Sequence, residues 1–290
     1  MRRDVRAGRR GGEATSTLPM PELPEVETVV RGLRPVLTGR RLERVELHRE
    51  GLRRPFPDGL VQRLTGATVT GIERRAKYGL IATDRDDTLI FHLGMSGRMR
   101  LDPPDRGKHD HAVFTTDDGH VVAFNDARRF GSLDLVPTDE IAAYPAFSVL
   151  GPEPLGPGLT PAYLKAKFAG RAAPVKPLLL DQRIVAGLGN IYACEALYIA
   201  GIDPRRAAGD VSAAKLGKLV PAIRATLEAA IAAGGSSLRD HVQVDGTLGY
   251  FQKSFCVYGR EGEPCPDGRG TVERIVQGGR STFFCRHRQR

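Results

Sequence analysis

The order of apolar and polar residues predicts a helix near the start of the chain. Apolar residues recur at helical spacing behind Pro24, and proline suits the first turn of a helix. We therefore expect a helix from about Pro24 to Leu37. The residues predicted to form its buried face are Val26, Val29, Val30, Leu33 and Val36.

Segments that alternate between apolar and polar residues follow this helix, as half-buried strands do. Asp118-Gly119 separates two of these segments and is a hairpin signal. Residues 20–137 are therefore predicted to form a helix followed by an antiparallel β-sandwich or barrel. The predicted strands are 42–47, 67–69, 79–83, 88–93, 113–116, 121–124 and 132–136.

A proline- and glycine-rich stretch at 138–158, interpreted as a linker, precedes a region of helical period. Thr160-Pro161 is a typical N-cap and first-turn pair. An apolar stripe over 216–231 predicts a long helix, which Pro221 is expected to kink. We expect residues 159–248 to form a helical domain.

The two ends of the chain have different patterns. Residues 249–290 return to short strands and tight turns. Residues 1–19 are polar and arginine-rich without apolar periodicity, so we interpret them as a disordered extension, or as a start assigned ahead of the true one at Met20. The whole pattern predicts a two-domain α+β fold, with an N-terminal helix and antiparallel sandwich followed by a helical domain and a C-terminal hairpin.

The charge balance narrows the class of partner. Lys and Arg number 43 against 34 Asp and Glu, a net charge of +9, which favours a polyanion such as nucleic acid. No apolar stretch of the chain is long enough to span a bilayer, so no membrane partner is expected. Four cysteines without a secretory signal argue for a reducing compartment rather than a disulfide framework. We expect a monomer in the cytoplasm.

Seven short segments carry the candidate chemistry, and their combination is more specific than any one of them. In this order, they closely resemble the bacterial formamidopyrimidine-DNA glycosylase family, whose members repair oxidised purines. The resemblance covers residues 20–290. The segments are MPELPEVE (20–27), RRAKY (74–78), HLGMSG (92–97), KHDH (108–111), NDARRFG (125–131), GLGNIY (187–192) and GGRSTFFC (278–285).

The resemblance implies four catalytic residues. Pro21 would be the nucleophile once Met20 is removed, since an α-amino group titrates near neutral pH and a secondary amine yields a cationic iminium. Glu22 would be the general acid that opens the sugar. Lys77 and Arg280 would contact phosphates and assist β- and δ-elimination. The alternative for Lys77 is a solvated lysine on an exposed strand face, and for Arg280 an ordinary hairpin arginine.

The family's DNA contacts transfer to further positions. An extruded base leaves a gap in the duplex that an apolar wedge and a guanidinium can fill. By resemblance, Met95, Arg129 or Arg128, and Phe130 would fill it, and Glu195 would line the lesion pocket. Asn190 would hold a phosphate within a helix–two-turn–helix. The other backbone contacts would be His109, Arg128 and Arg171.

The chain departs from the family in its C-terminal hairpin. Family members usually bind zinc there through two C-x-x-C pairs, but Gly268 and Arg288 stand where the second cysteine of each pair is expected. Zinc is therefore doubtful, and we expect two unpaired thiols in a hairpin that folds without metal. The remaining candidate ligands are Cys265, Cys285 and His287, with Asp267 and Cys256 as weaker substitutes.

The sequence thus predicts a bifunctional DNA glycosylase and β,δ-lyase acting on oxidised purines in duplex DNA. One alternative is an enzyme similar to endonuclease VIII that acts on oxidised pyrimidines. Another is a catalytically silent protein that binds lesions or abasic sites, which applies if Pro21 is internal to the mature chain.

Overall fold

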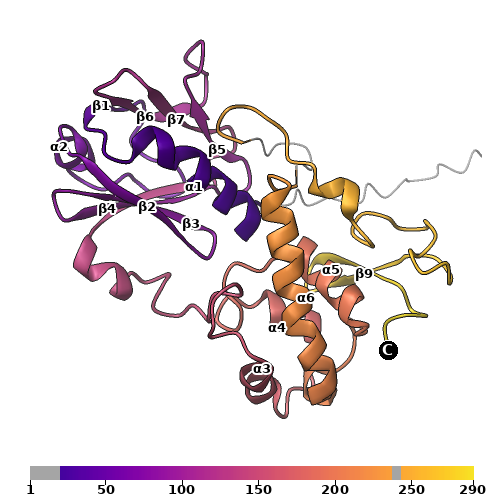
Figure 1. The fold of residues 1–290 in the computed structure, drawn as a ribbon. Coiled ribbons are helices and arrows are strands. Elements are labelled where there is room, and N and C mark those ends of the chain that lie inside the picture. The colour runs from indigo at the N-terminus through magenta and orange to yellow at the C-terminus, as the bar shows by residue number, and fades with distance from the viewer. Residues whose placement is uncertain (1–19, 237–242) are drawn as a thin grey trace, which may run out of the picture.

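The computed structural model describes residues 20–236 and 243–290, which form a β-rich domain and a helical domain with a C-terminal hairpin (Figure 1). The expected α+β architecture is confirmed. The extension predicted at 1–19 lies outside the described residues. Within the described ranges, no helix has the length and apolar character needed to cross a membrane.

The β-rich domain is a sandwich of two antiparallel four-stranded sheets. One sheet has the order β1-β6-β7-β5 and the other β2-β3-β4-β8. The predicted helix is α1 (Leu23–Leu37), whereas β5 and a short helix, α2 (Leu60–Leu64), were not predicted. The strands are β1 (Leu42–Leu47), β2 (Val69–Arg75), β3 (Tyr78–Thr83), β4 (Asp87–His92), β5 (Gly97–Leu101), β6 (Asp110–Thr116), β7 (Val121–Asp126) and β8 (Ser132–Pro137).

The apolar face of α1 explains why the sandwich closes around it. Val26, Val29 and Leu33 are fully buried in one cluster with the inward residues of both sheets. Outside the sandwich, the 3-10 helix η1 (Thr138–Ala143) follows β8 within the predicted linker. Burial of one helical stripe and two strand faces is the main source of this domain's stability.

The helical domain contains α3 (Pro161–Phe168), α4 (Val175–Leu180), α5 (Asn190–Ala200), the 3-10 helix η2 (Ala208–Asp210) and α6 (Ala213–Ala232). The predicted N-cap is confirmed, because the Thr160 hydroxyl accepts a hydrogen bond from Tyr163 N at 3.1 Å. The long predicted helix is α6, which continues through Pro221.

Each domain contributes a residue to the core of the other. Leu23, at the start of α1, is buried in the core of the helical domain. In return, Val244 is buried in the core of the sandwich, and its carbonyl accepts a bond from Leu101 N at 2.8 Å. A Cβ atom on Gly32 would lie 2.5 Å from Val244 Cγ2, so α1 needs a glycine where this segment crosses it. These contacts hold the start of α1 against the helical domain.

The C-terminal hairpin follows the 3-10 helix η3 (Phe251–Ser254) and consists of β9 (Glu273–Gln277) and β10 (Arg280–Phe284). The pairing places Arg280 opposite Gln277 at the tip of the hairpin. Its small core packs on α5 and includes Tyr198, Val257, Val272 and Phe283.

Candidate active site

The start of α1 and the turn before α5 form the centre of the site. Leu23 N donates to Gly187 O at 3.2 Å, and Ile191 N donates to Glu22 Oε1 at 3.0 Å. A Cβ atom on Gly189 would lie 2.1 Å from the carboxyl carbon of Glu22. The glycine is therefore required for the Glu22 carboxyl to lie against the first turn of α5. Pro21 is also buried, immediately before Glu22.

The burial of Glu22 changes its chemistry. Its side chain is 4% exposed, and desolvation raises the pKa to about 7, although the positive charge of Lys77 and the α5 amides lower it. Among the described residues, Glu22 Oε2 has no hydrogen-bond partner. A carboxyl group with a pKa near 7 and a free oxygen can hold and deliver a proton at neutral pH.

Lys77 is held in the same region by the turn between β2 and β3. Glu153 accepts from Ala76 N at 2.6 Å and from Arg75 Nη1 at 2.8 Å. This anchors Ala76 in the left-handed region, with φ 53°. The interpretation of Lys77 as a solvated lysine is wrong, because the turn directs it inward and leaves it 9% exposed. Burial lowers its pKa, the negative charge of Glu22 opposes that effect, and the positive charge of Arg280 adds to it, so both groups act electrostatically on Lys77.

Glu25 is a buried carboxylate that the sequence reasoning missed. It accepts hydrogen bonds from Glu22 N at 3.0 Å, Ser236 N at 2.9 Å and the Tyr192 hydroxyl. It therefore fixes the backbone of Glu22 and joins it to α5 and to the end of the segment after α6. The three-residue spacing between Glu22 and Glu25, as in a capping box, was the available signal.

A second buried charge positions the hairpin. Lys176 of α4 is fully buried and donates to Thr282 Oγ1 at 2.7 Å and to Asn190 Oδ1. Asn190 Nδ2 in turn donates to Ser281 O at 2.9 Å. The side chain predicted to hold a phosphate thus binds β10, directly beside Arg280. Lys176 was not predicted, since nothing local distinguishes it from a surface lysine.

The residues predicted to fill a vacated base stack lie on two adjacent loops. A Cβ atom on Gly94 would lie 2.4 Å from the carbonyl carbon of Phe130, so the loop that carries Met95 packs against the loop that carries Phe130. Phe130 is 41% exposed, and the Arg128 guanidinium lies 5.0 Å from its ring centroid. Arg129 has φ 60° and is exposed.

Asp126 organises these loops and was also missed. Its side chain is fully buried, with Oδ2 accepting from Gly131 N at 2.7 Å and Oδ1 accepting from Ser96 Oγ at 2.5 Å and Arg128 N at 3.2 Å. One carboxylate thereby fixes the backbone on both sides of Arg129 and Phe130. The buried Asp126 carboxylate therefore fixes the loop in which the Phe130 ring is exposed.

The remaining predicted contacts are His109, Arg171 and Glu195. His109 is half-buried, and its carbonyl accepts from Asp126 N at 3.0 Å. Arg171 is exposed between α3 and α4. Glu195 is 2% exposed and accepts from Cys256 N at 2.7 Å, Val257 N at 2.9 Å and Tyr258 N at 2.8 Å. These bonds place it beneath the 256–258 segment instead of at an open surface.

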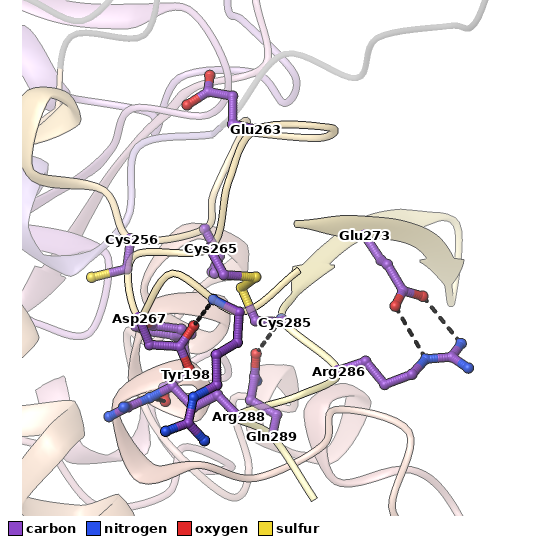
Figure 2. The surroundings of a disulfide bond; sticks show 12 residues. Tyr198, Cys256, Glu263, Cys265, Asp267, Glu273, Cys285, Arg286, Arg288 and Gln289 are labelled. Carbon is purple, nitrogen blue, oxygen red and sulfur yellow. Dashed lines mark hydrogen bonds and ion pairs between the residues drawn. A yellow bond between two sulfur atoms is a disulfide. The ribbon is translucent and has the colours of Figure 1, made fainter. Parts of the chain in front are cut away.

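The expectation of two unpaired thiols in the hairpin is wrong, because Cys265 and Cys285 form a disulfide (Figure 2). The hairpin brings their Cα atoms to 6.1 Å, a separation that suits a disulfide. Sulfurs bonded to each other are not thiolate ligands. His287 is exposed, and no group of three or more His, Cys, Asp or Glu in the described ranges could hold a metal ion. The residues present do not fit the family's zinc site.

Comparisons with known proteins agree with this geometry. The model of the formamidopyrimidine-DNA glycosylase N-terminal domain matches residues 20–133, and the model of the H2TH domain of the same family matches residues 150–242. The formamidopyrimidine-DNA glycosylase of Novosphingobium aromaticivorans is 66% identical over 266 residues, which are 92% of this chain and 98% of that protein.

Solved structures with the same fold include complexes of Lactococcus lactis Fpg. A variant bound to DNA that contains Fapy-dG has a TM-score of 0.85 and 36% identity. The complex with abasic-site DNA has a TM-score of 0.85 and 35% identity. Each covers 93% of this chain and 100% of the solved chain. The two-domain fold with a buried acid beside a proline is that of a DNA glycosylase for repair. The chain belongs to the formamidopyrimidine-DNA glycosylase family.

Proposed function

We propose that this chain excises oxidised purines from duplex DNA as a bifunctional glycosylase and AP lyase. The observation that carries the proposal is the Glu22 carboxyl next to Pro21, buried, with a pKa near 7 and a free oxygen. DNA as substrate is supported by the net charge of +9 and by the DNA bound in the similar Lactococcus lactis structures.

The proposed chemistry begins at the amine of Pro21. Its nitrogen attacks C1′ of the damaged nucleotide and the C1′–base bond breaks, and the proton that the Pro21 amine loses is taken up by the departing base. Glu22 donates its proton to the sugar ring oxygen, which opens the ring and leaves an iminium between Pro21 and C1′. The cation then accepts electrons as water takes the C2′ proton and the 3′ phosphate leaves, and hydrolysis of the iminium by water frees the Pro21 amine.

In this proposal, Lys77 and Arg280 bind the phosphates of the DNA. The positive charge of Arg280 lowers the pKa of Lys77, so an anion between the two side chains would be bound by both. Met95, Phe130 and an arginine beside Phe130 would occupy the space left by the extruded nucleotide. His109 and Arg171 remain proposed contacts with the DNA backbone.

The mechanism requires a free amine on Pro21, so the active form begins at that residue. A protein produced from Met20 should excise 8-oxoguanine and cleave abasic duplex, because initiator methionine is removed before proline. A protein that retains residues 1–20 should do neither. Equal activity of the two would contradict the proposal.

Substrate class is tested with the protein produced from Met20. Duplexes carrying 8-oxoguanine or a formamidopyrimidine should be cleaved faster than a duplex carrying an oxidised pyrimidine. The reverse order would support the pyrimidine-specific alternative. Binding without cleavage of any duplex would support the catalytically silent alternative.

A further inference from the structure

A disulfide joins Cys265, in the loop before β9, to Cys285, the residue directly after β10. Cys265 is 3% exposed and Cys285 is fully buried, and 20 positions separate them in the sequence. Both cysteines belong to the small core that joins the hairpin to α5, together with Tyr198 (Figure 2). The bond therefore lies at the base of the hairpin and connects its two sides.

The residue in place of the fourth family cysteine has taken a different role. Arg288 Nε donates to Tyr198 O at 3.0 Å, and its guanidinium lies 4.8 Å from the Tyr198 ring centroid. This places a cation at the carbonyl end of α5, where the helix dipole favours it. Gln289 accepts from Cys285 N at 2.8 Å and donates to Ile202 O at 2.9 Å. The segment after Cys285 is thus attached to the helical domain without a metal.

The disulfide is connected to the site through a single strand. Cys285 directly follows β10, which begins with Arg280. Lys176 and Asn190 hold the middle of this strand through Thr282 and Ser281, and the disulfide holds its end. Loss of the bond would detach the loop around Cys265 from the end of β10 and leave that end held by the Gln289 side chain.

We propose that the Cys265–Cys285 disulfide is a reversible covalent lock that replaces the family's metal and keeps Arg280 in the site. The inference rests on the proposed function only in assigning Arg280 a DNA contact. To close the lock, two thiols give two protons and two electrons to hydrogen peroxide, which becomes two water molecules. A dithiol reductant reopens it by exchange and is itself oxidised to a disulfide.

The two remaining cysteines do not compete for this bond. Cys194 and Cys256 adjoin the same core, but burial raises the pKa of each thiol to about 11. Little thiolate therefore exists at neutral pH to attack the disulfide. The sulfur of Cys256 also points away from the bond in Figure 2. Exchange with these two thiols therefore does not open the lock.

The state of the four cysteines is measured first. Cells that produce the full chain are treated with peroxide and lysed in N-ethylmaleimide, and the denatured protein is weighed by mass spectrometry. We expect two alkylated thiols per chain, and four after reduction. Four thiols before reduction would overturn the proposal.

The consequence for the hairpin is measured with Cys265→Ser/Cys285→Ser, and Cys256→Ala is the matched control. Trypsin should cleave the double variant faster after Arg269, Arg274 and Arg286, while the control keeps the wild-type rate. Incision of abasic duplex should fall in the double variant by the same factor as in Arg280→Ala, roughly 10- to 100-fold for one lost charge-assisted hydrogen bond.

The two proposals fail in different ways. If Arg280→Ala incises normally, the role assigned to Arg280 is wrong, and the lock is then judged on thiol count and proteolysis alone. If Arg280→Ala is impaired while the double serine variant incises and resists trypsin as the wild type does, the lock is contradicted and the proposed function stands.

Discussion

The two sides of the site are stabilised in different ways. The Glu22 side lies between the large cores of both domains, so apolar packing holds its backbone and buried carboxylates adjust it. The Arg280 side extends from a hairpin with a small core, where Val276 of β9 is 65% exposed. The Glu22 side is therefore held by the packing of the two cores, whereas the Arg280 side depends on the Cys265–Cys285 disulfide and on the buried Lys176. Predictions that alter each side separately therefore test the account.

The largest effect is expected at Glu22. Glu22→Gln keeps an oxygen that can accept from Ile191 N but has no acidic proton to transfer, so excision should fall about 100- to 10,000-fold. In the wild type, loss of the Glu22 proton as the pH rises through about 7 should lower the rate, whereas deprotonation of the Pro21 amine raises it, so the pH profile should have a maximum. Single-turnover excision from pH 5 to 9 measures both, and the variant should lack this decrease.

Glu22→Gln should raise the stability of the folded protein, although it lowers the rate of excision. The folded protein holds the Glu22 proton up to about pH 7, whereas an unfolded glutamate releases it near 4.5, so this group reduces stability as the pH rises between those values. Glu22→Gln should therefore be more stable than the wild type at pH 8, by up to about 3 kcal/mol, and equal to it at pH 4. Urea unfolding at both pH values measures this. A less stable variant at pH 8 would contradict the burial argument.

The next largest effect is expected from the close contact between Gly189 and the Glu22 carboxyl group. Gly189→Ala would place a methyl group 2.1 Å from the Glu22 carboxyl carbon, which must move. Displacement of a reacting group by about 1 Å lowers rates about 100-fold, and overpacking costs about 1–3 kcal/mol. The matched control is Gly217→Ala on α6, where nothing lies within 4 Å. Wild-type excision by Gly189→Ala would show that the α1–α5 contact does not position Glu22.

These positions show what the sequence could provide. The helix over α1, most strands and the Thr160 cap follow from local patterns, which act over a few residues. Pro21, Glu22 and Lys77 were identified by family resemblance. Glu25 and Asp126 were missed although each has a hydrogen-bond partner within five residues, Glu22 N for Glu25 and Gly131 N for Asp126. Lys176 was missed because its partner Thr282 is distant in the chain. The disulfide was missed for the same reason: its two cysteines approach only after β9 and β10 pair.

A smaller effect is expected at the exposed wedge. Phe130→Ala and Met95→Ala should slow excision from intact duplex about tenfold, while cleavage of preformed abasic sites changes less, because unstacking a base costs a few kcal/mol. Val149→Ala removes apolar surface from another exposed position and should change neither rate. Equal losses on both substrates would indicate a folding defect in place of a lost wedge.

The smallest effect is expected from metal removal. With the two hairpin sulfurs bonded to each other, purified protein should contain no stoichiometric zinc, and chelator should leave excision unchanged. Elemental analysis of the protein before and after chelation measures the first, and single-turnover kinetics the second. About one zinc per chain, with activity lost to chelator, would refute the metal-free hairpin and nominate His287 as a ligand.

The most direct test of the account is the identity of the residue that bonds to DNA. Protein produced from Met20 is mixed with 8-oxoguanine duplex and sodium borohydride, which reduces an iminium to a stable amine, and the digested adduct is mapped by mass spectrometry. The account predicts a DNA remnant on the nitrogen of Pro21, in the peptide that begins at that residue. A remnant on Lys77, or excision without any adduct, would contradict it.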